Sequence, residues 1–335
     1  MKLDALLPSV PLLEVPAIAR AAEQAGFAGL WSSETQHDPL LPLALAAEHT
    51  TRLTLGTALA VAFARSPGSL AYPAWDLANA SQGRFVLGLG TQVRAHIERR
   101  FGGTWSEAAA DRMREFIGGV RALWSSWQSG SRPNFRGEHY KITLMSPFFN
   151  PGPIADPDIP IFLAGVNPGM CRVAGEVADG LLVHPYHSLK YLDEVVRPAV
   201  VEGERRAGRP AGTVAFSVTT FIVPDPAWAD SARSQIAFYA STPTYRPVMD
   251  LHGWGSSATA LSDLARRGGW AEMGAQITDA MLEVFAVVAP WAELAAELRR
   301  RYGGLARRLA VYLPYRPGEQ DAFWRTLASD LATES

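Results

Sequence analysis

The chain is poor in the features that mark several classes of protein. Of its 335 residues only Cys171 is a cysteine, which excludes an intramolecular disulfide and fits a reducing compartment. Lysine and arginine number 31 against 33 aspartates and glutamates, and no block of like charge stands out, which argues against a nucleic-acid partner. The sequence has neither a signal-peptide pattern nor the roughly 18 uninterrupted apolar residues of a membrane helix. We therefore expect a cytoplasmic protein with no membrane partner.

Common catalytic motifs are also missing. The sequence contains no G-x-S-x-G elbow, no Walker A motif and no H-E-x-x-H zinc motif. His184 and His187 are spaced like a pair of metal ligands, but Pro185 between them argues against a helical pair and no acidic cluster adjoins. We predict no metal site.

Short apolar runs alternate with amphipathic helical segments along the chain. Eight runs are typical of strands, and they cover residues 3–7, 29–32, 53–63, 85–89, 161–164, 180–184, 214–223 and 308–313. Repeated strand–helix units imply a parallel sheet with right-handed crossovers, and eight units favour a closed barrel. The sequence thus predicts an α/β protein, a single (β/α)8 TIM barrel over residues 1–335, with loop or helix insertions at its C-terminal face.

Two stretches interrupt the alternation. Residues 129–160 hold six prolines and little periodicity, which we interpret as an excursion over the barrel face. Residues 242–277 mix proline, glycine and serine, and we expect an irregular insertion there. We expect helices over 278–288 and 291–302.

In barrels of this kind function gathers where strands run into the following loops. After the second strand come Trp31, Glu34, Gln36 and His37, which bring together an aromatic ring, a carboxylate, an amide and an imidazole. The imidazole could exchange a proton near neutral pH. The alternative is a plain loop in which Asp38 caps the next helix.

Three further strand ends carry special residues. Small residues around Ala58 and Ala60 would let a flat ring lie against the third strand, or they simply form a buried strand. Gly88 and Gly90 match part of a dinucleotide fingerprint whose third glycine is missing, although Gly90 could still let a ligand approach the backbone. The run Gly165, Val166 and Asn167 precedes a helix, and it predicts either a phosphate site or an ordinary capped turn.

Taken in order, these places resemble the bacterial luciferase-like superfamily of flavin and coenzyme F420 oxidoreductases. The resemblance is carried by residues 25–31 (AGFAGLW), 51–57 (TRLTLGT), 81–90 (SQGRFVLGLG) and 174–180 (AGEVADG). It covers nearly the whole chain, and residues 34–39 (ETQHDP) bring it nearest to the F420-dependent branch.

The resemblance implies a cofactor across the C-terminal mouth of the barrel. A non-prolyl cis peptide near Ala58–Leu59 would lie behind its ring, and the loop of residues 165–167 would bind its phosphate. The implied cofactor-binding residues are Thr35, Ala58, Leu59, Ala60, Gly90, Thr91, Gln92, His96, Gly165, Val166 and Asn167. The acidic tail of F420 would meet the basic residues Arg94, His96, Arg99 and Arg100, or these residues, Arg99 and Arg100 above all, simply form a solvated loop and helix face. The resemblance also suggests a homodimer.

Two departures bear on catalysis. F420-dependent sugar-phosphate dehydrogenases of this class carry an acid–histidine pair after the second strand, where this chain has Glu34–Thr35, with His37 the nearest histidine. They also carry a glutamate where this chain has Val93. His37 as proton donor, assisted by Glu34, is therefore a hypothesis, and a sugar-phosphate substrate is not expected.

The leading interpretation is hydride transfer between coenzyme F420 and a small organic substrate. The main alternative is an FMN-dependent monooxygenase that uses reduced flavin and O2; either cofactor would need a partner reductase. A non-catalytic flavin-binding homologue and a metal-dependent barrel hydrolase are more distant alternatives. The substrate pocket is predicted to take four aromatic residues, Trp31, Phe63, Phe149 and Tyr186.

Overall fold

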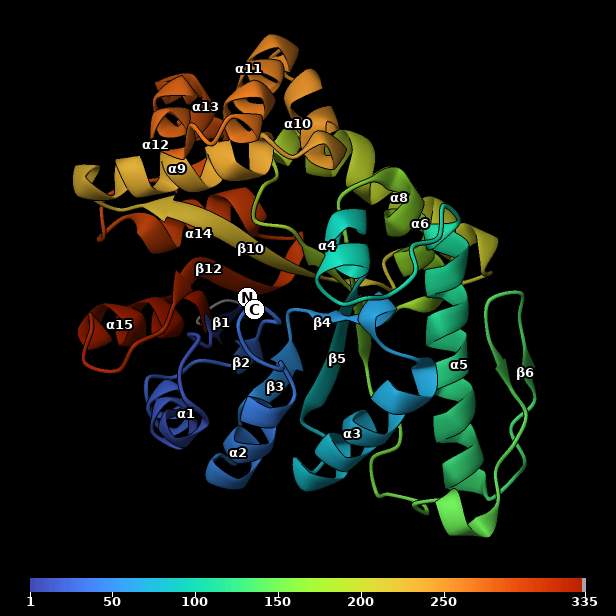
Figure 1. Cartoon of the computed structure of the whole chain (residues 1–335). Helices are drawn as coiled ribbons and strands as arrows, with labels where there is room; N and C mark the ends of the chain where they lie inside the picture. The colour runs from blue at the N-terminus through green and yellow to red at the C-terminus, as the bar shows by residue number, and fades with distance from the viewer. Residues whose placement is uncertain (333–335) are drawn as a thin grey trace.

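The computed structural model describes residues 1–332, so the last three residues of the predicted domain lie outside it. Within the described residues, eight parallel strands form a closed barrel (Figure 1), which confirms the predicted fold. In barrel order they are β1 (Lys2–Leu6), β2 (Gly29–Ser32), β3 (Thr54–Thr57), β5 (Phe85–Gly90), β8 (Ile161–Gly165), β9 (Gly180–Val183), β10 (Ala215–Val223) and β12 (Ala306–Pro314). Pairing of β10 with both β9 and β12, and of β12 with β1, closes the ring.

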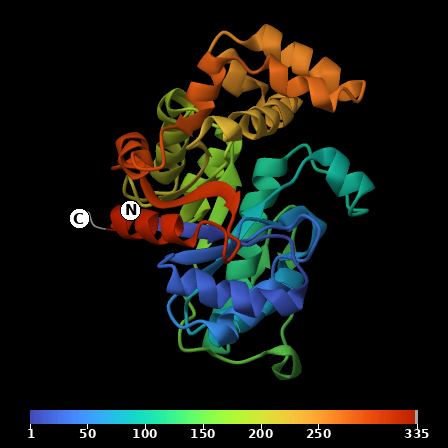
Figure 2. The same ribbon diagram turned by 90° about the vertical axis from the view of Figure 1, so that its left-hand side faces the viewer.

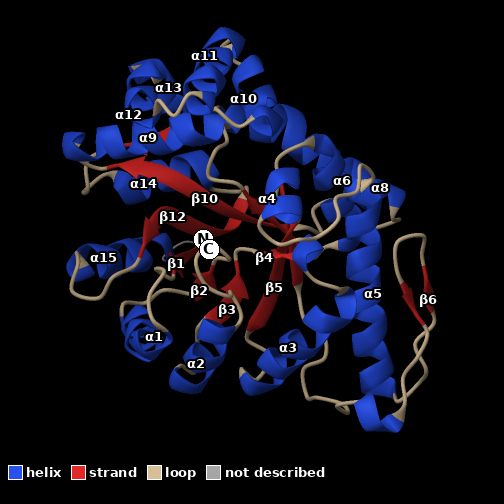
Figure 3. Ribbon diagram, in the orientation of Figure 1, coloured by secondary structure: helices blue, strands red, loops and turns tan. Residues whose placement is uncertain are grey.

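Helices surround the strands on the outside (Figure 3). The outer ring consists of α1 (Val15–Gln24), α2 (Leu41–His49), α3 (Pro67–Ala80), α5 (Ala109–Ser129), α6 (Pro168–Val177), α8 (Arg197–Arg206), α14 (Leu294–Tyr302) and α15 (Asp321–Ala332). The short helices α4 (Arg94–Arg99) and α7 (Leu189–Tyr191) follow β5 and β9. Each long helix turns an apolar side to the sheet, as the alternation of apolar strands and amphipathic helices predicts.

Large side chains fill the inside of the barrel. Trp31, Val86, Phe162 and Leu182 form a separate cluster there, with the Trp31 and Phe162 rings 6.0 Å apart. A Cβ atom at Gly56 would lie 2.4 Å from the Trp31 ring, so the glycine on β3 makes the space that the indole fills. The barrel interior is therefore a packed core and not a channel.

The N-terminal end of the barrel holds a buried ion pair. Arg308 on β12 donates two hydrogen bonds to Asp4 on β1, of 2.6 and 2.7 Å, and both side chains are at most 10% exposed. Burial raises the pKa of Asp4 even though the Arg308 guanidinium acts against that shift. The pair joins the first strand of the barrel to the last.

The excursion over residues 129–160 lies in a different place from the one predicted. It forms a hairpin, β6 (Phe135–Arg136) and β7 (Lys141–Ile142), whose turn donates three backbone N–H groups to Glu115 on α5. Its second half is bonded to α3, where Tyr72 donates to the carbonyl of Phe149. The segment therefore follows the outer sides of α3 and α5 (Figure 1) and does not cross the barrel face. We call residues 129–160 the outer strap. Its prolines suit an extended segment that packs against the outer sides of these helices.

The predicted irregular insertion is mostly helical. Residues 229–285 form α9 (Ala229–Ala240), α10 (Arg246–Asp250), α11 (Gly255–Arg266), α12 (Trp270–Met273) and α13 (Asp279–Phe285). Together they make a helical cap that projects from one side of the barrel (Figure 2). The prediction was wrong for α11 because serine and glycine obscured its buried apolar positions, Ala258, Leu261 and Leu264. It was also wrong for β11 (Ala286–Val288), a strand that pairs with β10 where a helix was expected.

Candidate active site

The predicted third strand is interrupted at the C-terminal end of the barrel. β3 stops at Thr57, the peptide bond Ala58–Leu59 is cis as the resemblance implies, and β4 (Ala60–Val61) resumes pairing with β5. The loop after β2 holds this bulge. Ala58 N–H donates to the Ser32 carbonyl at 2.7 Å, and Ser33 Oγ donates to the Ala58 carbonyl at 2.8 Å.

Gly88 and Gly90 make room for the bulge, and a cofactor contact of Gly90 stays a prediction. Thr57 Oγ1 both donates to the Gly88 carbonyl (2.6 Å) and accepts its N–H (2.9 Å), and a Cβ atom at Gly88 would lie 1.7 Å from the Thr57 carbonyl oxygen. A Cβ atom at Gly90 would lie 2.5 Å from the Leu59 side chain. The two glycines therefore allow β3 and the bulge to lie against β5, and Leu59 covers Gly90 in the described structure.

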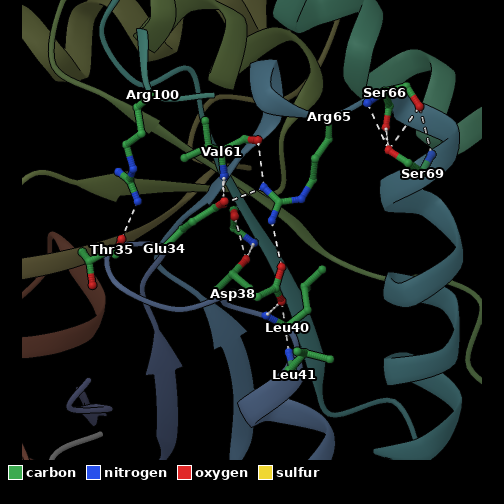
Figure 4. Close-up of polar contacts among 12 residues, drawn as sticks. Glu34, Thr35, Asp38, Leu40, Leu41, Val61, Arg65, Ser66, Ser69 and Arg100 are labelled. Atoms are coloured by element: carbon green, nitrogen blue, oxygen red, sulfur yellow. Dashed lines mark hydrogen bonds and ion pairs between the residues drawn. The ribbon is translucent and has the colours of Figure 1, made fainter. Parts of the chain in front are cut away.

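Glu34, predicted as catalytic, is bound up in an ion-pair network (Figure 4). Its Oε2 accepts the Val61 N–H at 2.7 Å and Arg65 Nη1 at 2.6 Å, and its side chain is only 7% exposed. Arg65 also reaches Asp38 at 2.9 Å, and Asp38 accepts the N–H groups of Leu40 and Leu41 at the start of α2, the capping role expected of it. This geometry gives Glu34 the task of fixing the far side of the bulge.

His37 and Thr35 lie on the same loop but face solvent. His37 is exposed and makes no hydrogen bond with any other residue in the described part of the chain. Thr35 is exposed, with its hydroxyl 3.2 Å from that of Ser9, and its carbonyl accepts a hydrogen bond from Arg100 beyond the end of α4 (Figure 4). Arg100 thus ties the segment after β5 to the loop after β2.

The segment after β5 carries the other predicted cofactor residues. Thr91 and Gln92 are partly exposed, and Gln92 has a left-handed backbone (φ 62°), with its side chain accepting the Val93 N–H at 3.0 Å. His96 lies exposed on α4. Arg94 is already paired with two carboxylates, those of Glu98 and Glu107, each at 2.9 Å. Of the basic residues there, Arg94 therefore has the least freedom to bind an acidic ligand.

The loop of residues 165–167 leads into α6 as predicted. Asn167 is the N-cap residue by position, but its amide donates to the Thr244 carbonyl at 3.0 Å and no side chain caps the helix. The first-turn N–H groups of α6 and the positive end of its dipole are therefore left for another acceptor. The phosphate site stays a prediction, and this uncapped end is consistent with it.

A cavity opens at the C-terminal end of the barrel interior. The residues that line it are Leu6, Trp31, Ala58, Leu59, Ala164, Leu182, Val183, His184, Pro185, Ser217, Thr219 and Ala310, none of them charged. A larger hollow lies at the opposite end of the barrel, between the end of α5 and the residues that precede β8 and β9, where the Arg121–Asp179 ion pair lines it. Ligand chemistry in such barrels gathers at the C-terminal end, so we take the cavity there as the candidate active site.

Of the four aromatic residues predicted for the pocket, only Trp31 lines this cavity. Phe63 is buried beneath Arg112, whose guanidinium carbon lies 4.3 Å from the ring centre. Tyr186 is fully buried and stacks on Phe285 of α13 at 4.8 Å. Phe149 is 60% exposed on the outer strap. The structure therefore gathers Trp31, Ala58 and Leu59 and leaves the other three rings elsewhere.

His184 is the polar residue of this cavity that the sequence analysis considered only as a metal ligand. It follows β9 directly, its Nδ1 accepts the Tyr186 N–H at 3.1 Å, and its ring lies against Tyr239 (4.6 Å) and Tyr245 (4.8 Å) from the helical cap. Burial, with a smaller effect from His187, lowers the pKa of His184 to about 3, so the imidazole is neutral at physiological pH. Its position at a strand end was the signal that could have singled it out.

His187 anchors the turn that carries His184. Its Nδ1 lies 2.8 Å from the His184 carbonyl and its Nε2 lies 3.0 Å from the Tyr302 hydroxyl, which in turn is 2.9 Å from Thr220 Oγ1. Burial lowers the pKa of His187 to about 4, so Nδ1–H donates to the carbonyl and Nε2 accepts from Tyr302. This neutral chain connects α14 and β10 to the cavity wall.

Within residues 1–332 no group of three or more His, Cys, Asp or Glu side chains is arranged to hold a metal ion. Over the same residues, no helix has the length and apolar character needed to cross a membrane.

Comparison with known proteins places the chain in a family. Residues 4–308 match the family model described as luciferase-like monooxygenase. The chain is 45% identical over 315 residues, 92% of each sequence, to an uncharacterised protein of Mycobacterium tuberculosis. It is 28% identical over 291 residues, 84% of each sequence, to a 5,10-methylenetetrahydromethanopterin reductase of Methanolobus tindarius.

A solved structure shares the fold. The coenzyme F420-dependent tetrahydromethanopterin reductase of Methanopyrus kandleri superimposes with a TM-score of 0.79 over 99% of this chain and 98% of that one, at 18% identity. With the family match over most of the sequence, and the barrel and its cis-peptide bulge in place, the chain belongs to the luciferase-like monooxygenase family.

Proposed function

We propose that this protein is an oxidoreductase that uses coenzyme F420 to transfer a hydride to or from a small organic substrate. The observation that carries the proposal is the mouth of the barrel, where an apolar floor of Trp31, Ala58 and Leu59 lies beside the loop that leads into the uncapped N-terminus of α6. A flat ring with a phosphate on its side chain needs both features. The similarity to a reductase of methylenetetrahydromethanopterin, over most of both sequences, supports a redox reaction.

The residues present fit such a cofactor. Ala58 and Leu59 would support the ring, and the first-turn N–H groups of α6, with the loop at Gly165 and Val166, would hold the phosphate. Of the basic residues after β5, Arg99 is exposed and makes no ion pair with another described residue, so it suits the acidic tail better than Arg94 does. Coenzyme F420, when bound, supplies the two-electron hydride carrier.

The chain's own residues would position the cofactor ring. Glu34 and Ser33 hold the bulge in place, and Leu59 covers Gly90, so the floor of the site is fixed before a ligand arrives. His37 as proton donor stays a prediction. Its ring is exposed, on the loop that Glu34 fixes, and it does not line the cavity. A homodimer and a separate reductase that supplies reduced cofactor also stay predictions, and light scattering of the purified protein checks the first.

The test is a titration of the purified protein with F420 and, separately, with FMN, followed by tryptophan quenching and cofactor spectra. We expect tight binding of F420 and weak binding of FMN. Tighter binding of FMN would contradict the proposal and favour a flavin-dependent monooxygenase. Failure to bind either cofactor would contradict any redox function of this site.

Asn167 offers a matched pair of variants for the phosphate site. An aspartate there would cap α6 and complement its dipole, which stabilises a helix by roughly 0.5–2 kcal/mol, yet its charge would repel a phosphate. We therefore expect Asn167→Asp to bind F420 at least about tenfold more weakly than Asn167→Ser, with equal or greater stability to urea. Equal affinities of the two variants for F420 would show that its phosphate does not bind at this helix end.

A further inference from the structure

We infer that His184 binds the oxygen atom of the substrate, and that this substrate is a neutral carbonyl or hydroxyl compound to which Nε2–H of the imidazole donates a hydrogen bond. The inference rests on the proposed function and goes beyond it, because it names the residue that recognises the substrate and the chemical class recognised.

The hydrogen bonds of His184 fix its tautomer. Nδ1 accepts the backbone N–H of Tyr186 at 3.1 Å, so the proton of the neutral ring is on Nε2. Nε2 has no hydrogen-bond partner among residues 1–332, although the ring lines the cavity. In the described part of the chain, the fully buried polar side-chain atoms without a partner do not include Nε2, so this N–H group is open to the cavity. A donor in such a position is commonly satisfied by a ligand or by water. His184 therefore presents one unused donor to the cavity.

The surroundings of His184 are uncharged. The groups that face it are Tyr239 and Tyr245 from the cap, Tyr186 in its own turn, and the neutral His187 behind it. Burial raises the pKa of each of the three tyrosines, so none of them ionises at physiological pH. The other polar residues that line the cavity are Ser217 and Thr219.

A charged substrate does not suit this cavity. A phosphate or carboxylate taken from water needs a cationic partner, and the described cavity wall contains no lysine or arginine. A ketone, aldehyde or alcohol loses little on entering an apolar cavity once its oxygen accepts one hydrogen bond. The wall therefore selects a neutral oxygen compound over an acidic one of the same size.

His184 acts in this site as a hydrogen-bond donor that keeps its proton. A neutral imidazole held by a backbone N–H at Nδ1 is a poor base, because protonation would require that hydrogen bond to break. The ring can still polarise a carbonyl oxygen in a dry site, where a fixed donor is worth more than in water.

Three residues behind His184 act as positioning residues. His187 donates to the His184 carbonyl, the Tyr302 hydroxyl donates to His187, and Thr220 is hydrogen-bonded to Tyr302, all inside the protein. This series of hydrogen bonds ends on the backbone of His184, so it sets the direction of the ring without touching the substrate.

The test follows the imidazole nitrogens by 15N NMR of histidine-labelled protein, with cyclohexanone as the neutral probe and cyclohexanecarboxylate as the charged one, with and without F420. We expect the resonance of His184, assigned by its loss in His184→Gln, to show the Nε2–H tautomer and no titration between pH 5 and 8. Cyclohexanone should shift it and cyclohexanecarboxylate should not. A titrating His184, no response to 50 mM cyclohexanone, or a stronger response to the carboxylate would overturn the inference.

Two variants separate the donor from its support. His184→Ala should weaken cyclohexanone binding about tenfold, while His184→Gln, which keeps an N–H donor, should recover part of it. Tyr302→Phe removes the link to His187 and should broaden or shift the His184 signal and weaken cyclohexanone binding, with F420 affinity unchanged. An unaltered His184 response in Tyr302→Phe would overturn the positioning role.

The F420 titration keeps the two proposals apart. If F420 fails to bind while cyclohexanone still shifts His184, the proposed cofactor is wrong and the oxygen-binding role stands. If F420 binds and His184 does not respond to cyclohexanone, the proposed function stands and this inference falls.

Discussion

At the N-terminal end of the barrel Asp4 and Arg308 form a buried charged pair, whereas the connected polar groups beside the cavity at the C-terminal end, His184, His187, Tyr302 and Thr220, are neutral. At the first end both partners are supplied by the protein, so the charge is always matched. At the second end one partner is a ligand that comes and goes. A neutral donor left without a partner costs about 1–3 kcal/mol, but a buried charge left alone costs far more. This difference indicates that the polar groups of the N-terminal end hold the barrel closed, whereas those of the C-terminal end suit a ligand that binds and leaves.

Breaking the charged end should have the largest effect on stability. Arg308→Met leaves Asp4 buried and unpaired, and we expect the free energy of unfolding in urea to fall by about 3–5 kcal/mol. The Asp4→Leu/Arg308→Met double variant removes both charges and should recover most of that loss. A single variant that loses less than about 1 kcal/mol would show that the pair is not needed for closure.

Low pH should have the second largest effect on stability, through the neutral buried residues at the C-terminal end. The pKa of His187 is about 4 in the folded protein and near 6.5 in the unfolded chain, so below pH 6.5 the unfolded chain gains a proton that the native state does not. The stabilisation is present above pH 6.5 and is lost as the pH falls to about 4, at up to roughly 1.4 kcal/mol per pH unit. His187→Gln should show a shallower fall in urea stability over this range. Parallel profiles for the two proteins would contradict a neutral, buried His187.

The mouth of the barrel also contains the charged pair of Glu34 and Arg65. A variant of Glu34 tests whether this pair contributes to stability, to ligand affinity or to both. Glu34→Gln keeps an acceptor for the Val61 N–H but loses the charge that pairs with Arg65. We expect a loss of about 1–2 kcal/mol in unfolding free energy, smaller than for Arg308→Met, and a weaker affinity for F420 as the bulge loosens. Unchanged F420 affinity would show that the ion-pair network of Glu34 does not contribute to cofactor binding.

Exposed charge should matter least. Arg99→Gln should weaken F420 binding by no more than about fivefold and lower its salt dependence, because an exposed ion pair contributes at most about 1 kcal/mol. Arg94→Gln is the matched control, since Arg94 is already paired with Glu98 and Glu107, and it should bind F420 nearly as the unaltered protein does. The reverse order would place the acidic tail on Arg94.

The sequence predicted the barrel well because burial leaves a direct trace in it. β5 and β9 are buried along their whole length, so their apolar runs end within one residue of the strand ends. Closure of the ring followed from counting eight such runs. The path of the strap over 129–160 could not be predicted, because its position depends on single contacts such as those of Glu115 and Tyr72 with backbone atoms far away in sequence.

The candidate site was predicted less completely, because its residues act through partners remote in the chain. Gly88 matched part of a dinucleotide fingerprint. The structure shows that a glycine is needed there because the Thr57 carbonyl leaves no room for a Cβ atom, and this contact exists only in the folded protein. The catalytic role of Glu34 stays a prediction, and the sequence did not indicate its ion pair with Arg65. The tautomer of His184 depends on a turn, and that turn depends on Tyr302, more than a hundred residues later.

The Asp4–Arg308 pair has a consequence for synthesis on the ribosome. Its two members are 304 residues apart, so Asp4 leaves the exit tunnel long before its partner exists. At roughly 5–20 residues per second the interval is roughly 15–60 s, during which the first strand has neither its ion pair nor its neighbour β12. The edge of β1 that pairs with β12 therefore stays unpaired until translation is nearly complete, and slow codons late in the message would lengthen that interval.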